Sequence, residues 1–245
     1  LYYSDRLMEF PLGVFGIALA TAILPSLSRK HTEGSMTQFS GTLDWAMRLT
    51  LLIALPAAIG LAVLATPMLT TLFQYGALGE YDIEMASRSL IAYALGLLGF
   101  AFIKVLAPGF YARQDTRTPV RIGVIAMLAN MVLNLILVFP LAHAGLALAT
   151  TLSAFLNAGL LYMGLRRQGI YHPGPGWGVF ALRVSIAGLV MMGLLWFMKG
   201  ESSMWFSADL ATRSLRLVGL ISMGALGYFC ALILLGMRLR DIVSR

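Results

Sequence analysis

Long apolar blocks decide what this chain can fold into. Seven stretches of about 20 mostly apolar residues follow one another, at 4–27, 45–65, 85–106, 120–140, 145–165, 179–198 and 211–236. A helix of about 20 apolar residues is long enough to cross the hydrocarbon core of a bilayer, roughly 30 Å. The composition agrees, because 59% of the residues are hydrophobic and only 12% are charged. The sequence therefore predicts an all-α polytopic membrane protein with seven transmembrane helices.

The pieces between these blocks are short and polar. The connections contain the Arg, Gly and Pro residues that end helices and start turns, at 28–35 (SRKHTEGS), 113–119 (RQDTRTP) and 166–176 (RRQGIYHPGPG). None of them is long enough for a soluble domain. We therefore expect no soluble domain between the spans.

Basic residues gather on one side of the predicted membrane. If successive spans alternate in direction, that side collects Arg29, Lys30, Arg48, Arg113, Arg117, Arg121, Arg166, Arg167, Arg183, Arg238, Arg240 and Arg245. The opposite side holds five basic residues, namely Arg6, Arg88, Lys199, Arg213 and Arg216. Six acidic residues offset them: Asp5, Glu80, Asp82, Glu84, Glu201 and Asp209. Because cytoplasmic loops carry an excess of Arg and Lys, the bias predicts an outside N-terminal end and a cytoplasmic C-terminus. It also explains the net charge of +7 without nucleic acid as a partner.

Motifs for catalysis and for metal binding are missing from the sequence. No Gly-rich loop precedes a Lys and a Ser or Thr, as in phosphate-binding loops, and no nucleophile is paired with a base. His31, His143 and His172 are scattered at loops and helix ends without the spacing of metal ligands. The single Cys230 cannot form an internal disulfide. We therefore expect no metal centre and no enzyme activity.

The first span carries charges that are costly inside a bilayer. It begins SDRLMEFPLGVF, and spacings of three and four place one stripe on a single helix face: Arg6, Glu9, Gly13, Gly16 and Ala20. A charged residue inside the membrane usually faces a partner or a water-filled cavity, and small residues let another helix approach closely. We therefore expect this stripe to face protein. Asp5 and Glu9 can lower the cost by ion pairing with Arg6; the alternative is that Arg6 only neutralises these acids near the headgroups.

Pro11 and Pro56 each lie inside a predicted span. Pro11 removes the helix hydrogen bond to the carbonyl of Leu7, and Pro56 removes the one to the carbonyl of Leu52. Bent spans with freed backbone groups are common where a transporter forms a cavity, although proline also occurs in static spans. Both prolines are therefore candidate bends of a transport protein.

Two segments carry a family resemblance. SDRLMEFPLGVFGIALATAILPSLSR (4–29) and FYARQDTRTPV (110–120) resemble signature segments of the MurJ or MviN family of bacterial lipid II flippases, in the multidrug/oligosaccharidyl-lipid/polysaccharide exporter superfamily. The resemblance extends over the whole chain, which would correspond to the second half of a fourteen-span member. It implies five helices of the C-terminal lobe in residues 1–168, and two additional helices with a cytoplasmic tail in residues 169–245.

The resemblance also implies an activity and partners. Family members move lipid II, the lipid-linked peptidoglycan precursor, from the cytoplasmic to the periplasmic leaflet of the inner membrane, through a cationic cavity that alternates between the two sides. The spans that carry the remaining cavity arginines are not in this chain, so the resemblance implies the N-terminal half of the same transporter and membrane lipids as partners. Two alternatives stay open: an exporter of another polyprenyl-linked saccharide or of a drug, and a noncatalytic membrane scaffold.

The resemblance assigns roles to the charged start of the first span. By motif position, Arg6 resembles the essential cavity arginine of the family, and Asp5 and Glu9 resemble its acidic neighbours. A guanidinium offers planar donors that match the oxygens of a diphosphate, and it stays charged at any relevant pH. Substrate binding by Arg6, Asp5 and Glu9 is therefore predicted.

Two asparagines form the other polar feature inside a predicted span. Asn130 and Asn134 lie four residues apart on one helix face, and Thr150 and Thr151 open the next span. One reading is interhelical hydrogen bonding, a common role of amides in membrane bundles. The other is a cation site formed by Asn130, Asn134 and Thr150, similar to the sodium site of some family members. An acid in place of Asn134 would bind a cation better, so such a site would be weak.

Overall fold

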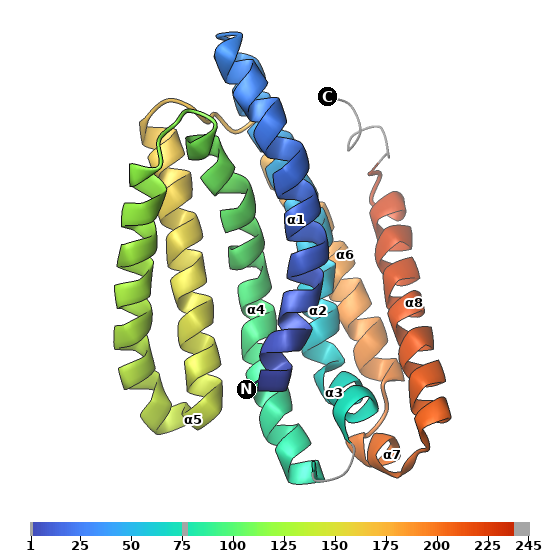
Figure 1. Cartoon of the computed structure of the whole chain (residues 1–245). Helices are drawn as coiled ribbons and strands as arrows, with labels where there is room; N and C mark the ends of the chain where they lie inside the picture. The colour runs from blue at the N-terminus through green and yellow to red at the C-terminus, as the bar shows by residue number, and fades with distance from the viewer. Residues whose placement is uncertain (1, 75–77, 238–245) are drawn as a thin grey trace.

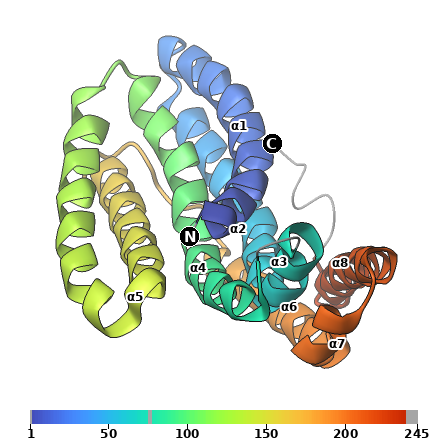
Figure 2. The same ribbon diagram turned by 60° about the horizontal axis from the view of Figure 1, so that its bottom comes forward.

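The computed structural model describes residues 2–74 and 78–237, and the side chains of residues 15, 17–20 and 22 also lie outside the description. Its regular elements are helices, in the order α1 (Tyr2–Thr32), α2 (Met36–Val63), α3 (Ala65–Phe73), α4 (Glu80–Tyr111), α5 (Arg117–Arg167), α6 (Trp177–Met198), α7 (Ser202–Ser207) and α8 (Leu210–Leu234). The long helices run roughly side by side (Figure 1, Figure 2). Within the described residues, five helices are long and apolar enough to cross a membrane: α2, α4, α5, α6 and α8. The expected all-α membrane fold is confirmed.

Helix α5 is a hairpin of two long arms (Figure 1). At Ala142 the backbone leaves the helical region, with φ 47° and ψ −125°, and the chain reverses. A glycine is required shortly afterwards, because a Cβ at Gly145 would lie 2.1 Å from the carbonyl oxygen of Leu137. The two arms correspond to the expected spans at 120–140 and 145–165.

Hydropathy does not predict the two short helices, α3 and α7, and it does not fix the exact number of spans. α3 follows α2 after Leu64, which has φ −96° and ψ 17°, and α7 lies in the connection between α6 and α8. Neither helix is long enough to give a membrane-span signal. The expected span at 4–27 falls within α1, where several central side chains lie outside the description. A count of seven spans therefore stays a prediction.

The first two helices extend beyond the apolar blocks that predict them. α1 continues to Thr32 and α2 begins at Met36, so residues 33–35 connect them instead of the expected 28–35. Hydropathy detects the apolar part of a helix, whereas a polar turn continues the same helix outside the bilayer. The helix stops where Gly34 takes a positive φ of 69°, which glycine adopts without strain.

Helix α4 is central to one part of the bundle, since it packs against α1, α2 and α5. Glycines allow its close approach to the second arm of α5. A Cβ at Gly96 would lie 2.6 Å from Thr151 Oγ1, and one at Gly99 would lie 3.0 Å from the backbone nitrogen of Phe155. Across the same interface, Thr151 Oγ1 donates to the carbonyl oxygen of Ala92 at 2.7 Å. This interface therefore combines small residues with an interhelical hydrogen bond, as is common in membrane bundles.

Helices α6 and α8 form a pair that lies on α2, away from α5 (Figure 1, Figure 2). Side chains from the three helices share one buried cluster, which includes Leu52, Val184 and Tyr228. The predicted division of the chain into residues 1–168 and 169–245 is not tested by this packing and stays a prediction. Residues 238–245, where a cytoplasmic tail is expected, lie outside the described residues.

The connection between α5 and α6 is fixed to α2 by a carboxylate. Asp44 Oδ1 accepts hydrogen bonds from Trp177 Nε1 at 2.6 Å and from Tyr171 Oη at 2.8 Å. It also accepts from the backbone nitrogen of Gly174 at 3.0 Å. Asp44 Oδ2 accepts from Arg48 Nε at 2.8 Å, and the Arg48 guanidinium lies 5.1 Å from the ring centre of Trp177. Burial, together with the neighbouring carboxylate, raises the pKa of the Tyr171 phenol. We call these five residues the loop clamp.

Three connections that are flanked by basic helix ends, here called the basic connections, lie together at one end of the bundle. Residues 33–35, 112–116 and 168–176 lie at the upper end in Figure 1, and Arg113 donates to the side-chain oxygen of Gln168 at 3.0 Å. The turn of α5 and helix α7 lie at the opposite end (Figure 1). Successive long helices therefore alternate in direction, as the charge argument assumes. Which end faces the cytoplasm stays a prediction.

Candidate functional site

Arg6 lies in the second turn of α1, on the outside of the bundle. Its side chain is 59% exposed, and its Nη1 forms a salt bridge of 2.9 Å with Glu9 Oε2. The guanidinium also lies 5.2 Å from the ring centre of Tyr2. Ser4 anchors this part of α1, because it is fully buried and its Oγ donates to the carbonyl oxygen of Ala86 in α4 at 2.8 Å. Arg6 is therefore accessible on a helix end that is fixed in position.

The two acids predicted to hold Arg6 are placed differently. In the described part of the chain, Glu9 is the acid that pairs with the guanidinium of Arg6. Asp5 lies close enough to Tyr93 of α4 to interact with it electrostatically. Neighbouring residues diverge by about 100° around a helix, so Asp5 turns away from Arg6, whereas Glu9, three residues further on, returns to its side. The substrate-binding role of these three residues stays a prediction.

The stripe of small residues is open over part of its length. A Cβ at Gly13 would meet no atom within 4 Å, whereas one at Gly16 would lie 3.4 Å from Cγ of Lys104. Ala20, the last member of the stripe, lies outside the described side chains. The stripe therefore touches α4 at Gly16, and the described residues leave its charged end uncovered.

Lys104 is a second cation on this side of the molecule, and the sequence analysis missed it. It falls inside the expected span at 85–106, its side chain is exposed, and its aliphatic stem rests on Gly16 of α1. Arg6 and Gly16 are ten residues apart, so Lys104 meets α1 about 15 Å from Arg6, at 1.5 Å per residue. A lysine within an apolar block was the available signal. It was missed because the comparison of charges on the two sides of the membrane counts residues at the ends of spans and not residues inside them. We call Arg6, Glu9 and Lys104 the charged face.

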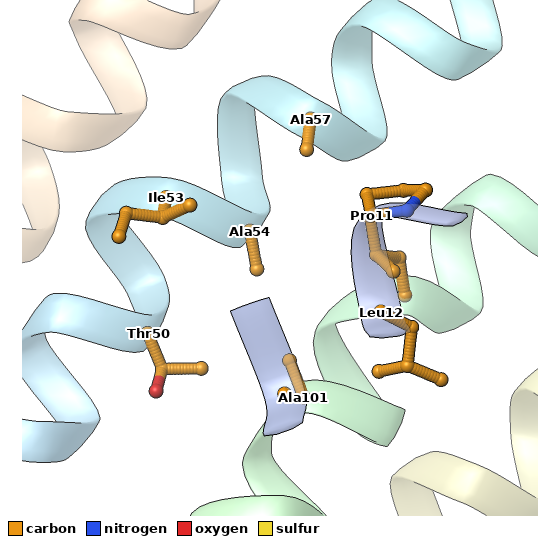
Figure 3. A pocket seen from close by; sticks show the side chains of 9 residues that line it. Pro11, Leu12, Thr50, Ile53, Ala54, Ala57 and Ala101 are labelled. Carbon is orange, nitrogen blue, oxygen red and sulfur yellow. The ribbon is translucent and has the colours of Figure 1, made fainter. Parts of the chain in front are cut away.

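A narrow recess opens between α1, α2 and α4, next to the stem of Lys104 (Figure 3). Its walls are Pro11, Leu12, Gly16, Thr50, Ile53, Ala54, Ala57, Leu97 and Ala101. The hydroxyl of Thr50 is already satisfied, since Oγ1 donates to the carbonyl oxygen of Ala46 at 2.7 Å. The lining of the recess is therefore mainly apolar, while the charged face beside it is suited to an anion.

The predicted amide cluster joins the two arms of α5. Asn130 Nδ2 donates to Ser153 Oγ at 3.3 Å and to Thr150 Oγ1 at 3.5 Å. Asn134 Nδ2 donates to Asn130 Oδ1 at 3.0 Å. Asn134 Oδ1 is buried without a hydrogen-bond partner, so one oxygen of the cluster is available to a cation. The structure thus brings the residues together mainly as a hydrogen-bond network between the arms. Among the residues that the structure describes, no three His, Cys, Asp or Glu side chains are grouped as metal ligands.

A bundle of membrane-length helices, with cations on an uncovered helix face beside an apolar recess, has the features of one lobe of a membrane transporter. Comparison with known proteins identifies the family. The chain belongs to the lipid II flippase MurJ family, whose model matches residues 1–215.

Individual relatives agree with this assignment. The probable lipid II flippase MurJ of Vibrio cholerae is 52% identical over 242 residues, which are 99% of this chain and 46% of the relative. The corresponding protein of Haemophilus influenzae is 48% identical over 251 residues, covering 100% of this chain and 49% of the relative. A solved structure of lipid II flippase MurJ in an inward closed conformation shares the fold, with a TM-score of 0.73, 24% identity, and coverage of 94% of this chain and 47% of that chain. The chain thus spans about half the length of the curated relatives it matches.

Proposed function

We propose that this chain supplies the second half of a lipid II flippase, which moves lipid II from the cytoplasmic to the periplasmic leaflet by alternating access. The observation that carries the proposal is the exposed Arg6–Glu9 pair on the uncovered face of α1. The family that matches and the names of the relatives support lipid II as the substrate. The chain spans about half the length of those relatives. We therefore propose that its partner is the N-terminal half of the same transporter.

Arg6 is the residue proposed to bind the diphosphate of the substrate. Glu9 holds the guanidinium when no substrate is bound, and the diphosphate replaces it with oxygens that match the planar fork of donors. The exposure of the pair supports such an exchange, since water screens the attraction between Arg6 and Glu9. Asp5, which lies near Tyr93 of α4 in this structure, is proposed as a second acid that helps to hold the guanidinium in the empty site.

Lys104 is proposed as a second contact for the anionic group. It meets α1 at a different depth from Arg6, so a diphosphate crossing the membrane passes one cation and then the other. The recess beside the stem of Lys104 would receive an apolar part of the substrate. Rocking of two lobes about such a site exposes it to each side in turn, with Pro11 and Pro56 as candidate bends. No covalent bond changes, so the activity is transport and not enzymatic catalysis.

The proposed location is the bacterial inner membrane, with the N-terminal end periplasmic and the C-terminal end cytoplasmic. The gathering of basic connections at one end of the bundle supports this orientation. Membrane lipids would cover the exposed apolar side chains, such as Phe139 and Phe197, which are 87% and 89% exposed.

A sodium site at Asn130, Asn134 and Thr150 is a second proposal. It is carried by Asn134 Oδ1, which is buried and without a hydrogen-bond partner. Amide and hydroxyl oxygens suit a hard cation, but the hydrogen bonds among these residues compete with it. The competing interpretation is a purely structural network between the arms of α5.

Reconstitution tests the proposed function. A full-length transporter that contains this sequence would be placed in vesicles, with lipid II supplied to one leaflet, and arrival in the other leaflet followed with a reagent that cannot cross the membrane. Transfer of lipid II above that of protein-free vesicles supports the proposal. Transfer of another polyprenyl-linked saccharide or of a drug, without lipid II, would favour the exporter alternative. No transfer of any of them would favour the scaffold.

A further inference from the structure

Helix α2 contains a carbonyl that its own helix cannot satisfy. Pro56 has no backbone N–H, so the carbonyl oxygen of Leu52, four residues earlier, loses its helical partner. Leu52 is 6% exposed, which leaves little access for water. A buried carbonyl without a donor is costly, and the fold therefore has to supply one from elsewhere.

Tyr228 of α8 supplies that donor. Its Oη donates to the carbonyl oxygen of Leu52 at 2.8 Å, and its side chain is 1% exposed. The ring lies in the buried cluster shared by α2, α6 and α8. A single hydrogen bond thus connects the last long helix to the proline site of α2.

The other side of α2 at this level lines the recess. Successive residues turn by about 100° around a helix, so Ile53, Ala54 and Ala57 point away from the side that carries Leu52. These three residues form one wall of the recess, and Pro11 of α1 lies in its wall too (Figure 3). A change in the direction of α2 at the proline would therefore move one wall of the recess.

Contacts at both ends of the α6–α8 pair fix the position of α8 along the axis of α2. At the end away from the basic connections, buried Arg213 donates from Nη2 to the carbonyl oxygen of Phe206 at 2.7 Å and from Nη1 to that of Thr70 in α3 at 3.4 Å. At the opposite end, the loop clamp fixes the start of α6, the partner of α8, to Asp44. Tyr228 lies between these two attachments, so its hydroxyl cannot follow Leu52 freely.

We propose that Tyr228 is a positioning residue for transport. By capping the carbonyl of Leu52, its hydroxyl sets the direction of α2 at Pro56, and with it the shape of the recess beside the charged face. The effect on transport rests on the proposed function, whereas the effect on α2 is independent of any substrate. The pair of α6 and α8 then acts on the site without contacting the substrate there.

A double-mutant comparison in the full-length transporter tests this role. Tyr228→Phe removes the hydroxyl and keeps the ring. Pro56→Ala restores a backbone N–H that can donate to Leu52 within α2, so the hydroxyl of Tyr228 becomes dispensable. Tyr162→Phe is the matched control, because Tyr162 is half-buried and its hydroxyl makes no hydrogen bond within the described residues.

Two measurements are made on every variant. Spin labels at Gln38 in α2 and Leu72 in α3, in a background free of other cysteines, report the distance across Pro56, and a vesicle assay reports the rate of lipid II transfer. We expect Tyr228→Phe to shift the distance distribution and to lower the transfer rate roughly three- to tenfold at an unchanged membrane level. In the Pro56→Ala background, the same substitution should change neither quantity.

Three results would overturn the proposal. One is an unchanged distance distribution in Tyr228→Phe, and another is an equal effect of this substitution in both backgrounds. The third is the same shift from Tyr162→Phe. If the wild-type protein transfers no lipid II, the proposed function fails, but the distance measurement still decides the role of Tyr228.

Discussion

Removal of the Asp44 carboxylate should loosen the end of the molecule where α5 connects to α6. Asp44 is the shared acceptor of the loop clamp, with partners at 2.6–3.0 Å on both sides of the connection. The side chains of Asp44 and Arg48 are only 13% and 25% exposed, so this ion pair is largely shielded from water. Its loss leaves several donors and one guanidinium without their acceptor.

The expected destabilisation follows from these contacts. Removing one partner of a buried ion pair costs about 3–5 kcal/mol. We place Asp44→Ala at the lower end, about 3 kcal/mol, because Arg48 still donates to the carbonyl oxygen of Pro175 at 2.8 Å and still stacks on Trp177. Asp44→Asn keeps Oδ1 as an acceptor but loses the charge, so we expect about 1–2 kcal/mol.

The assay is reversible unfolding of the purified protein in a bilayer mimic, accompanied by proteolysis of residues 168–176. Asp209→Asn is the matched control, since it makes the same chemical change at the exposed N-cap of α8, where asparagine caps as well as aspartate. We expect no measurable loss of stability from the control and faster cleavage of the connection in both Asp44 variants. An Asp44→Ala protein as stable as the control would refute the reasoning.

Three further predictions concern topology, the second cation and the amide cluster. Cysteines placed at Thr118 and Gly169 should react with an impermeant reagent from the cytoplasm only, and one at Gly79 from the periplasm only; labelling of Gly79 and Thr118 from the same side would contradict the alternating arrangement. Lys104→Met keeps an unbranched apolar stem but removes the ammonium, so it should lower lipid II transfer roughly tenfold, or about 1.4 kcal/mol of barrier, at a normal membrane level; unchanged transfer would remove Lys104 from the path. Asn134→Asp should strengthen stabilisation by sodium in a melting assay, whereas melting that is insensitive to sodium in both forms would leave the cluster as a structural network.

Hydropathy predicted the membrane helices because a bilayer demands apolar side chains on every exposed face. The hairpin of α5 was also predictable, since two apolar blocks are separated by the short segment around Ala142. Helices α3 and α7 were not, because each is too short for a span signal and depends on packing against its neighbours. The polar extension of α1 was missed for a different reason. Outside the bilayer, a polar segment can be helical or a loop, and hydropathy does not distinguish the two.

At the candidate site, local contacts were predictable and distant ones were not. The pairing of Arg6 with Glu9 follows from a spacing of three residues on one helix. The stem of Lys104 meets Gly16 only because α1 and α4 pack together, and the sequence contains no sign of that register. The sequence predicted Pro56 as a candidate bend. It did not predict the donor to the freed carbonyl of Leu52, because that donor, Tyr228, lies on α8.

The central claim is that Arg6 contacts the diphosphate of lipid II and that Glu9 holds the guanidinium in its absence. The most direct measurement is the rate at which lipid II reaches the periplasmic leaflet in a full-length transporter with substitutions at these two positions, with the membrane level of each variant quantified. The account predicts that Arg6→Ala abolishes transfer at a normal membrane level. Arg6→Lys should rescue poorly, because a point charge lacks the two-pronged geometry, and Glu9→Gln should be milder. Normal transfer by Arg6→Ala would contradict the account, and loss of that variant from the membrane would make Arg6 a structural ion-pair residue instead.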